Sequence, residues 1–273
     1  MKAIKGLSRT KEYTYYYLKH LGIIAAFAYL ISNALRVLRS GRYVITDKVP
    51  ILLPTKAGLL FCTFEDLSVL WEVFCERVYS FSTHPKIVVD VGAHIGIFTL
   101  YVKKVCPYSQ IIAVEPCPLS FRLLKLNMRL TKLSNIIVVP YALSLSRGCT
   151  TLYSGLGWRG VSTTKLEFAK HFTKHGKTIL KVPTITLDDL ARSMHVTSID
   201  LIKIDVEGAE LDVLKGGSET LTRTKELVIA AYHTPTEADE IEVFLRERRF
   251  NVRRYHAGGA TYIYAVNIWV KGG

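Results

Sequence analysis

The feature that most constrains the fold is a regular alternation of short apolar runs and amphipathic segments after residue 85. The apolar runs are "KIVVDVG", "QIIAVEP", "NIIVVPYAL", "SIDLIKIDVEG" and "ELVIAAYH". Helical patterns follow four of these runs, at residues 95–105, 119–131, 209–217 and 236–249. Because uninterrupted apolar strands are buried on both faces, this alternation predicts an α/β domain with a mostly parallel sheet and helices on both of its faces.

Segments outside this alternation predict extensions of the same domain. "VPILLP" and "AGLLFCTF" favour a short hairpin, a helix is expected over residues 65–81, and "NVRRYHA" with "TYIYAVNIWV" predicts a closing hairpin. "CTTLYS" favours an added strand, and residues 155–181 look like an excursion, a segment that departs from the alternation of strands and helices. We therefore divide the chain into an N-terminal helical arm (1–42), a hairpin and helix (43–84) and the main domain (85–273).

Positive charge is concentrated in two places. The chain has 36 Lys and Arg against 23 Asp and Glu, a net charge of +13, and residues 1–42 and 155–181 carry +7 and +5 of it. Such segments are either solvated basic surfaces or contacts for an anionic partner, which is membrane phosphate or nucleic acid. Residues 21–35 hold no charge but fall short of the roughly 20 residues that span a bilayer. The arm is therefore predicted to pack on the domain or to lie at a membrane surface, on a cytoplasmic protein.

The five cysteines show no metal-binding spacing. They are scattered through the chain without a CxxC pair or a Cys/His zinc pattern. Reduced structural thiols are the simplest interpretation, and we predict no metal ligands from the sequence.

A glycine-containing turn, "VVDVGAHIGIFTLY", stands where the first strand of the main domain gives way to a helix. In open parallel sheets, ligands bind beyond the carboxyl ends of the strands. Gly92 would let the backbone turn sharply, and Gly96 would let a ligand or the strand approach the first helical turn. Exposed amides there favour a carboxylate or phosphate, although a tight packing turn explains two glycines equally simply.

An acidic residue at the end of the next strand strengthens the ligand interpretation. Glu115 follows Gly92 by about twenty residues, where an acid can accept hydrogen bonds from both hydroxyls of a ribose. The three-glycine dinucleotide fingerprint is absent, which argues against a nicotinamide oxidoreductase. A nucleoside cofactor without a pyrophosphate fits better, and S-adenosylmethionine is the cofactor we predict.

Ionisable residues crowd the stretch "LIKIDVEGAELDVLKG". Lys203, Asp205, Glu207 and Glu210 lie at the end of a strand and the start of a helix. Asp205 could simply cap the helix, and Lys203 could alternate out of the sheet. Alternatively, a carboxylate here could orient or deprotonate a hydroxyl. His233, at the end of the next apolar run, is a second candidate base or a structural histidine.

Together, "VVDVGAHIGIFTLY", "AVEPCPLSFRLLKLN", "TITLDDL" and "LIKIDVEGAELDVLKGG" resemble the FkbM family of S-adenosylmethionine-dependent methyltransferases. The resemblance covers about two-thirds of the chain and implies a class I methyltransferase fold with a seven-stranded sheet. The predicted cofactor residues are Asp90, Gly92, His94, Gly96, Thr99, Glu115 and Pro116, and the predicted catalytic residues are Asp205, Glu207 and His233. The chain departs from the family pattern at His94, Leu145 and Ala231, where Asn, Asp and Glu are common.

The resemblance implies an O-methyltransferase that acts on a hydroxyl of a small molecule, a sugar or a lipid-linked glycan. The basic excursion suits an alternative, methylation of a ribose hydroxyl in RNA. A non-catalytic cofactor-binding protein is a third possibility, because the departures at Leu145 and Ala231 remove acids that the family usually has.

Overall fold

The computed structural model describes residues 51–55, 58–63, 66–82, 84–155, 162–167, 169 and 177–270, together with Tyr15 and Lys19. The expected contacts of the basic arm and of most of the stretch 155–181 therefore lie outside the described residues. Within the described part of the chain, no helix is both long and apolar enough to cross a bilayer.

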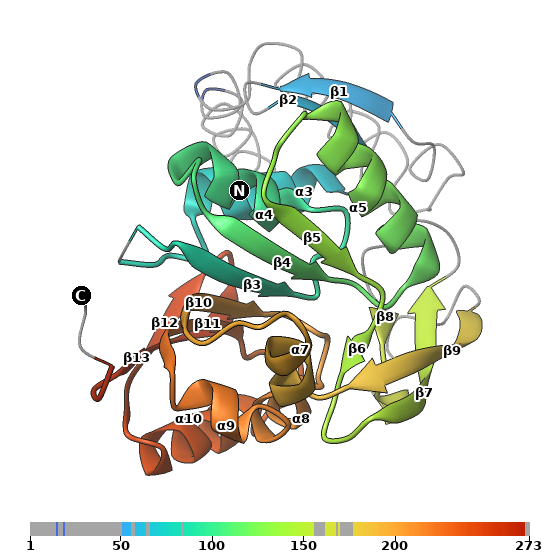
Figure 1. The fold of residues 1–273 in the computed structure, drawn as a ribbon. Coiled ribbons are helices and arrows are strands. Elements are labelled where there is room, and N and C mark those ends of the chain that lie inside the picture. The colour runs from blue at the N-terminus through green and yellow to red at the C-terminus, as the bar shows by residue number, and fades with distance from the viewer. Residues whose placement is uncertain are drawn as a thin grey trace, which may run out of the picture.

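A seven-stranded sheet forms the centre of the molecule (Figure 1). Its strands, in spatial order, are β12 (Phe250–Ala257), β13 (Ala260–Asn267), β11 (Thr224–Ala230), β10 (Ile199–Ile204), β3 (Ile87–Val91), β4 (Gln110–Val114) and β5 (Ile136–Val139). All neighbours pair in parallel except β13, which is antiparallel to both β11 and β12. The chain runs outward from β3 to β5 and resumes at β10 on the other side of β3. The carboxyl ends of β3 and β10 therefore mark the switch point at which α/β sheets bind ligands.

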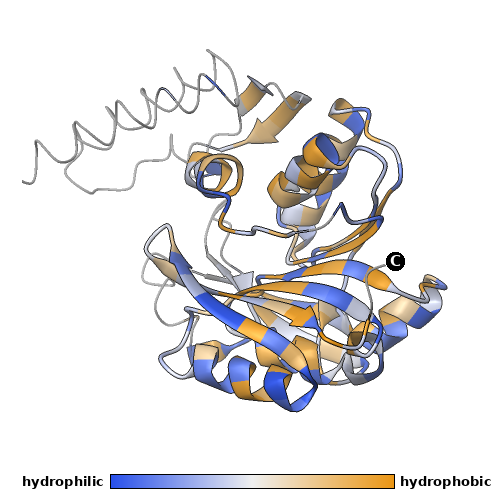
Figure 2. Cartoon of the chain, turned by 90° about the vertical axis from the view of Figure 1, so that its left-hand side faces the viewer, coloured by the Kyte–Doolittle hydropathy of each residue, from blue (hydrophilic) through white to orange (hydrophobic). Residues whose placement is uncertain are grey.

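Helices cover both faces of this sheet, as the apolar runs predict (Figure 2). One face carries α3 (Asp66–Trp71), the π-helical turn η2 (Glu72–Glu76), α4 (Ile97–Val105) and α5 (Pro118–Leu130). The other carries α7 (Leu187–Ser193), α8 (Glu210–Lys215), α9 (Ser218–Leu221) and α10 (Glu237–Glu247). Neighbouring strand residues alternate between two hydrophobic cores: Val88 packs on the first face and Val89 on the second. The predicted α/β architecture is confirmed.

The hairpin expected near residue 50 is also confirmed. It consists of β1 (Ile51–Thr55) and β2 (Gly58–Cys62), and Leu53 and Leu60 from it join the first core. The helix expected over 65–81 is shorter than predicted, because α3 ends at Trp71 and the π-helical turn ends at Glu76. Arg77 then takes a left-handed conformation (φ 52°) that turns the chain away from the helical path.

A second sheet of four strands lies between β5 and β10 in the sequence. It comprises β6 (Ala142–Leu143), β9 (Lys177–Ile185), β7 (Gly148–Gly155) and β8 (Ser162–Thr163), in that spatial order. The predicted strand "CTTLYS" is part of β7, and the end of the predicted excursion is the first half of β9. The expected strand over 135–143 is divided, since β5 belongs to the large sheet and β6 to the small one.

Candidate functional site

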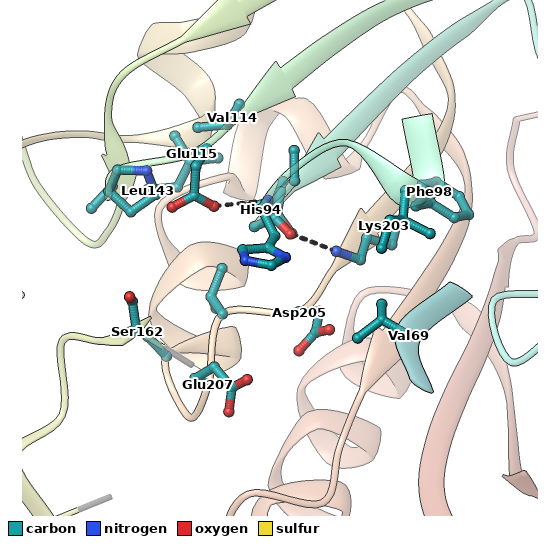
Figure 3. Close-up of a pocket in the computed structure, with 18 of the residues that line it drawn as sticks. Val69, His94, Phe98, Val114, Glu115, Leu143, Ser162, Lys203, Asp205 and Glu207 are labelled. Carbon is teal, nitrogen blue, oxygen red and sulfur yellow. Dashed lines mark hydrogen bonds between the residues drawn. The ribbon is translucent and has the colours of Figure 1, made fainter. Parts of the chain in front are cut away.

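A cavity of about 490 Å³ opens beyond the carboxyl ends of β3, β4 and β10 (Figure 3). Its walls come from the turns after these three strands, from α3 and η2, and from the small sheet. Of the predicted site residues, six line it: Gly92, His94, Glu115, Pro116, Asp205 and Glu207. The switch point of the sheet is therefore hollow, as the strand order requires of a ligand site.

Gly92 allows two neighbouring strand ends to meet. Its φ is +75°, and a Cβ atom on it would lie 1.8 Å from the backbone oxygen of Asp205. The amides of Gly92 and Ala93 both donate to the carbonyl of Val114 at 3.0 Å. The glycine is thus required by the close approach of the chain after β10, and the turn it makes is tied to β4 as well.

Lys203 and Asp90 form a buried ion pair beneath this turn. The two residues are register partners on β10 and β3, so their side chains project from the same face of the sheet. Lys203 Nζ lies 3.3 Å from Asp90 Oδ1 and donates to the carbonyl oxygen of Gly92 at 2.8 Å. Thr99 donates to Asp90 Oδ2 at 2.7 Å. The alternative in which Lys203 simply alternates out of the sheet toward solvent is wrong, since its side chain is 4% exposed.

Gly96 serves helix packing. Its φ is +94°, and a Cβ atom would come within 2.7 Å of Leu124 Cδ1 and 2.8 Å of Met128 Cε on α5. Gly96, like Asp90 and Thr99, is absent from the cavity wall. These three residues shape the turn from behind, and a direct cofactor contact for them stays a prediction.

Glu115 is held rigidly in the cavity wall. Its Oε2 accepts a hydrogen bond from the amide of His94 and its Oε1 one from the amide of Cys117, both at 2.8 Å. Burial raises the pKa of Glu115, while the two amides and nearby His94 oppose that rise. Each oxygen keeps a second lone pair, so the fixed carboxylate can accept further hydrogen bonds from a ligand.

The predicted catalytic residues meet at the end of β10. Asp205 Oδ2 accepts a hydrogen bond from the Tyr79 hydroxyl at 2.6 Å, and Asp205 Oδ1 lies 3.7 Å from His233 Nε2. Glu207 Oε2 lies 3.4 Å from the same nitrogen. The alternative role of Asp205 as a helix cap is wrong, because Ala209 is the N-cap of α8 and no side chain caps it.

His233 lies three residues beyond the end of β11, in the turn before α10, and carboxyl groups flank both of its nitrogens. Glu210 Oε1 and Glu237 Oε2 lie 3.2 and 3.3 Å from its Nδ1. Burial alone would lower the pKa of His233, but Glu210, Glu237 and Asp205 outweigh it and raise that pKa to about 11. Burial, with Asp205 close by, raises the pKa of Glu207 to about 8. Crowded negative charge is therefore the main electrostatic property of this part of the site.

The comparisons with known proteins agree with this geometry. The profile of the Methyltransferase FkbM domain matches residues 90–252. Methyltransferase sdnD of Sordaria araneosa is 30% identical over 213 residues, which cover 68% of this chain and 82% of that relative.

The chain belongs to the FkbM methyltransferase family.

A second relative and a solved structure extend the comparison. The 2-O-methyltransferase NoeI of Sinorhizobium fredii is 52% identical over 46 residues, 17% of this chain and 19% of NoeI. The crystal structure of methyltransferase FkbM from Methylobacillus flagellatus has a TM-score of 0.53 at 18% identity, and the match covers 71% of this chain and 47% of that one. The chain thus spans about half of that crystallised FkbM protein, which shares its fold.

Membership in the FkbM family confirms three predictions. The fold is the class I methyltransferase fold, the enzyme is a methyltransferase, and its cofactor is S-adenosylmethionine. Neither the family nor the fold assigns roles to individual residues, so the cofactor and catalytic residues above remain predictions.

The residues of this FkbM protein that line the cavity without being marked by the sequence include Glu72, Tyr79 and Tyr232. Tyr79 is brought in by the left-handed turn at Arg77, inside a segment that reads as continuous helix. No local pattern signals this, because the turn depends on packing against α4 and β13, where the Tyr79 ring meets those of Phe98 and Tyr262 edge-on. Of the family departures, Leu145 is exposed and Ala231 is buried.

Proposed function

We propose that this FkbM protein is an O-methyltransferase that methylates a hydroxyl of a small molecule, a sugar or a lipid-linked glycan. The observation that supports it most is the position of Asp205. Its carboxylate lies in the cavity wall at the end of β10, next to the turn that Gly92 forms, and His233 lies behind it. A carboxylate so placed can orient an acceptor hydroxyl and take its proton.

The cavity fits the cofactor at the residues that would hold it. Glu115 offers two fixed oxygens with lone pairs to spare, which suits the two hydroxyls of a ribose. The turn at Gly92, held by Lys203, carries no side chain and so leaves room for the amino acid part. When bound, S-adenosylmethionine supplies an electrophilic methyl group. The enzyme would then contribute mainly alignment of the acceptor oxygen and acceptance of its proton.

The charge of the cavity favours an uncharged, hydroxyl-bearing acceptor. Asp66, Glu72, Asp205 and Glu207 all line it. Burial raises the pKa of Glu72 to about 7 and that of Glu207 to about 8, so these two groups carry only part of a negative charge near neutral pH. Carboxyl groups in either state form hydrogen bonds with sugar hydroxyls, a charged Asp205 disfavours a phosphodiester beside it, and Tyr232 offers an aromatic face for a sugar ring. The name of NoeI, a 2-O-methyltransferase, supports oxygen as the accepting atom. We therefore favour a neutral acceptor over the ribose of RNA.

Label transfer tests the proposal directly. The full-length protein would be incubated with methyl-labelled S-adenosylmethionine and separate lipid, glycan, RNA and protein fractions. We expect label in the glycan or lipid fraction, in an alkali-stable methyl ether. Label in RNA, or on a nitrogen or carbon atom, would contradict the proposal.

The cofactor assignment predicts the effect of Glu115→Ala. Two charge-assisted hydrogen bonds would be lost, each of which contributes about 1.5–3 kcal/mol. The affinity for S-adenosylmethionine should fall by at least about tenfold, as measured by calorimetry. Glu247→Gln, an exposed substitution on α10, serves as the control and should bind like the wild type. Unchanged affinity in a folded Glu115→Ala variant would place the ribose elsewhere.

The catalytic assignment predicts the effect of Asp205→Asn. The amide keeps the shape of the side chain but loses the charge that orients the hydroxyl and accepts its proton. We expect turnover to fall on the order of a hundredfold or more while cofactor affinity changes little. Asp205 caps no helix but accepts the Tyr79 hydrogen bond, so urea unfolding of the Asn variant is measured beside its rate to separate a loss of stability from a loss of catalysis. Full activity in the Asn variant would remove Asp205 from the mechanism and leave His233 as the candidate.

A further inference from the structure

His233 is surrounded by more carboxyl groups than a single proton acceptor requires. Asp205, Glu210 and His233 each place one potential ligand atom within 4.8 Å of the others. Glu207 lies at the edge of this group, with its Oε2 3.4 Å from His233 Nε2. Glu237 flanks the imidazole on the opposite side, at Nδ1. Four carboxyl groups therefore surround one imidazole in a largely buried place.

Two oxygens in this cluster point to a missing positive partner. Glu210 is fully buried, yet its Oε2 has no hydrogen-bond partner among the described residues. The same holds for Asp205 Oδ1 within the described part of the chain. Buried carboxylate oxygens are rarely left unsatisfied, because each loses its hydration without compensation. Among the described residues, a protonated His233 would bring one positive charge to the four carboxyl groups around it. Lys203 is already engaged by Asp90 and by the Gly92 carbonyl.

We propose that Asp205, Glu210 and His233 form a binding site for a divalent cation of the Mn²⁺ type. One imidazole and two carboxylates are a ligand set that suits such a metal. Asp205 lines the cavity and Glu210 lies behind it, so the cation would sit between the protein and a bound acceptor. Glu237 accepts a hydrogen bond from the His233 amide at 2.8 Å, which would hold the histidine as outer-shell carboxylates hold metal ligands.

This site rests on the proposed function only for its chemical role. A cation at Asp205 could coordinate an acceptor hydroxyl and lower its pKa, so that the oxygen loses its proton more readily when the methyl group is transferred. Binding of the cation itself requires no acceptor and no cofactor. Failure of the methylation proposal would thus leave the cation site standing, and the two can be tested separately.

Direct titration of the full-length protein with Mn²⁺ tests the site, with free Mn²⁺ followed by electron paramagnetic resonance. We expect one cation per chain. Loss of a partner that merely orients a ligand costs about 10–100-fold in metal affinity, so Glu210→Gln should weaken binding by at least about tenfold. Asp205→Asn should do the same. The exposed Glu247→Gln is the matched control and should bind like the wild type.

Two results would overturn the proposal. If the folded wild type binds no Mn²⁺, Mg²⁺ or Zn²⁺, the cluster is satisfied by a shared proton, which the interaction between the Glu210 and Glu237 carboxyls could hold. If Mn²⁺ binds equally well to both variants, its site lies elsewhere. Circular dichroism of each variant confirms that lost binding is not lost folding, and two different ligand substitutions keep the test open if one fails to fold.

Discussion

Gly92→Ala is expected to destabilise the protein by more than about 4 kcal/mol, which is exceptional for a single substitution. The added Cβ atom would stand 1.8 Å from the Asp205 carbonyl oxygen, and a backbone atom cannot move aside as a flexible side chain can. Either the chain after β10 shifts or the turn after β3 opens. Both changes would disrupt the cavity, so S-adenosylmethionine binding should disappear together with stability.

Gly259→Ala provides a matched control for Gly92→Ala. Gly259 lies in the turn between β12 and β13 at a similar φ, +83° against +75°, but nothing lies within 4 Å of its would-be Cβ atom. Its replacement should cost only the backbone strain of a left-handed alanine, about 1 kcal/mol. Urea unfolding of both variants measures the difference. Equal costs at the two glycines would show that the close approach at Gly92 is relieved without penalty.

Lys203→Met is expected to cost about 3–5 kcal/mol of folding free energy, because it leaves the Asp90 carboxylate buried without its cation. Asp90 is fully buried, and among the described residues Thr99 would still donate a hydrogen bond to its carboxylate. The Gly92 carbonyl would lose its donor as well. The double variant Lys203→Met/Asp90→Asn should recover part of the loss, since it removes the uncompensated charge.

A second cross-strand pair in the same sheet serves as the control for Lys203. Lys225 Nζ lies 2.8 Å from Asp200 Oδ1, but the two side chains are 26% and 15% exposed. Water can therefore solvate Asp200 after Lys225→Met, which should cost about 1 kcal/mol or less. Denaturant unfolding compares the two substitutions. Similar losses at both positions would mean that burial of the Asp90 pair adds nothing.

The large sheet could be predicted from sequence because each of its central strands is an apolar run that packs on both faces. The small sheet could not be predicted so fully. β9 reads "KTILKVPTI", whose polar residues and proline resemble a loop, and only its pairing with β7 defines it as a strand. The π-helical turn after α3 was missed for a related reason, since Glu72 to Glu76 continue a helical pattern.

Site residues could be predicted from the sequence where they directly follow a strand. Glu115 and Asp205 each follow a strand directly, and both line the cavity. The prediction failed where the contacts of a side chain depend on pairing with the neighbouring strand. For Lys203 the sequence left open a side chain that simply alternates out of the sheet, because only the register of β10 against β3 places it opposite Asp90. Tyr79 could not be found at all, since its approach to Asp205 depends on tertiary packing.

One wall of the cavity comes from the small sheet and the residues next to it, not from the large sheet. Ser162 and Thr164 line the cavity, Thr163 Oγ1 donates to the Glu207 carbonyl at 2.6 Å, and Lys165 Nζ lies 2.5 Å from Asp212 Oδ2. Gly92 and Glu115, in contrast, directly follow strands of the large sheet. Insertions and substitutions between β5 and β10 can reshape one wall while the strands that form the other stay untouched, so a lineage can change its preference for a partner molecule without rebuilding the enzyme.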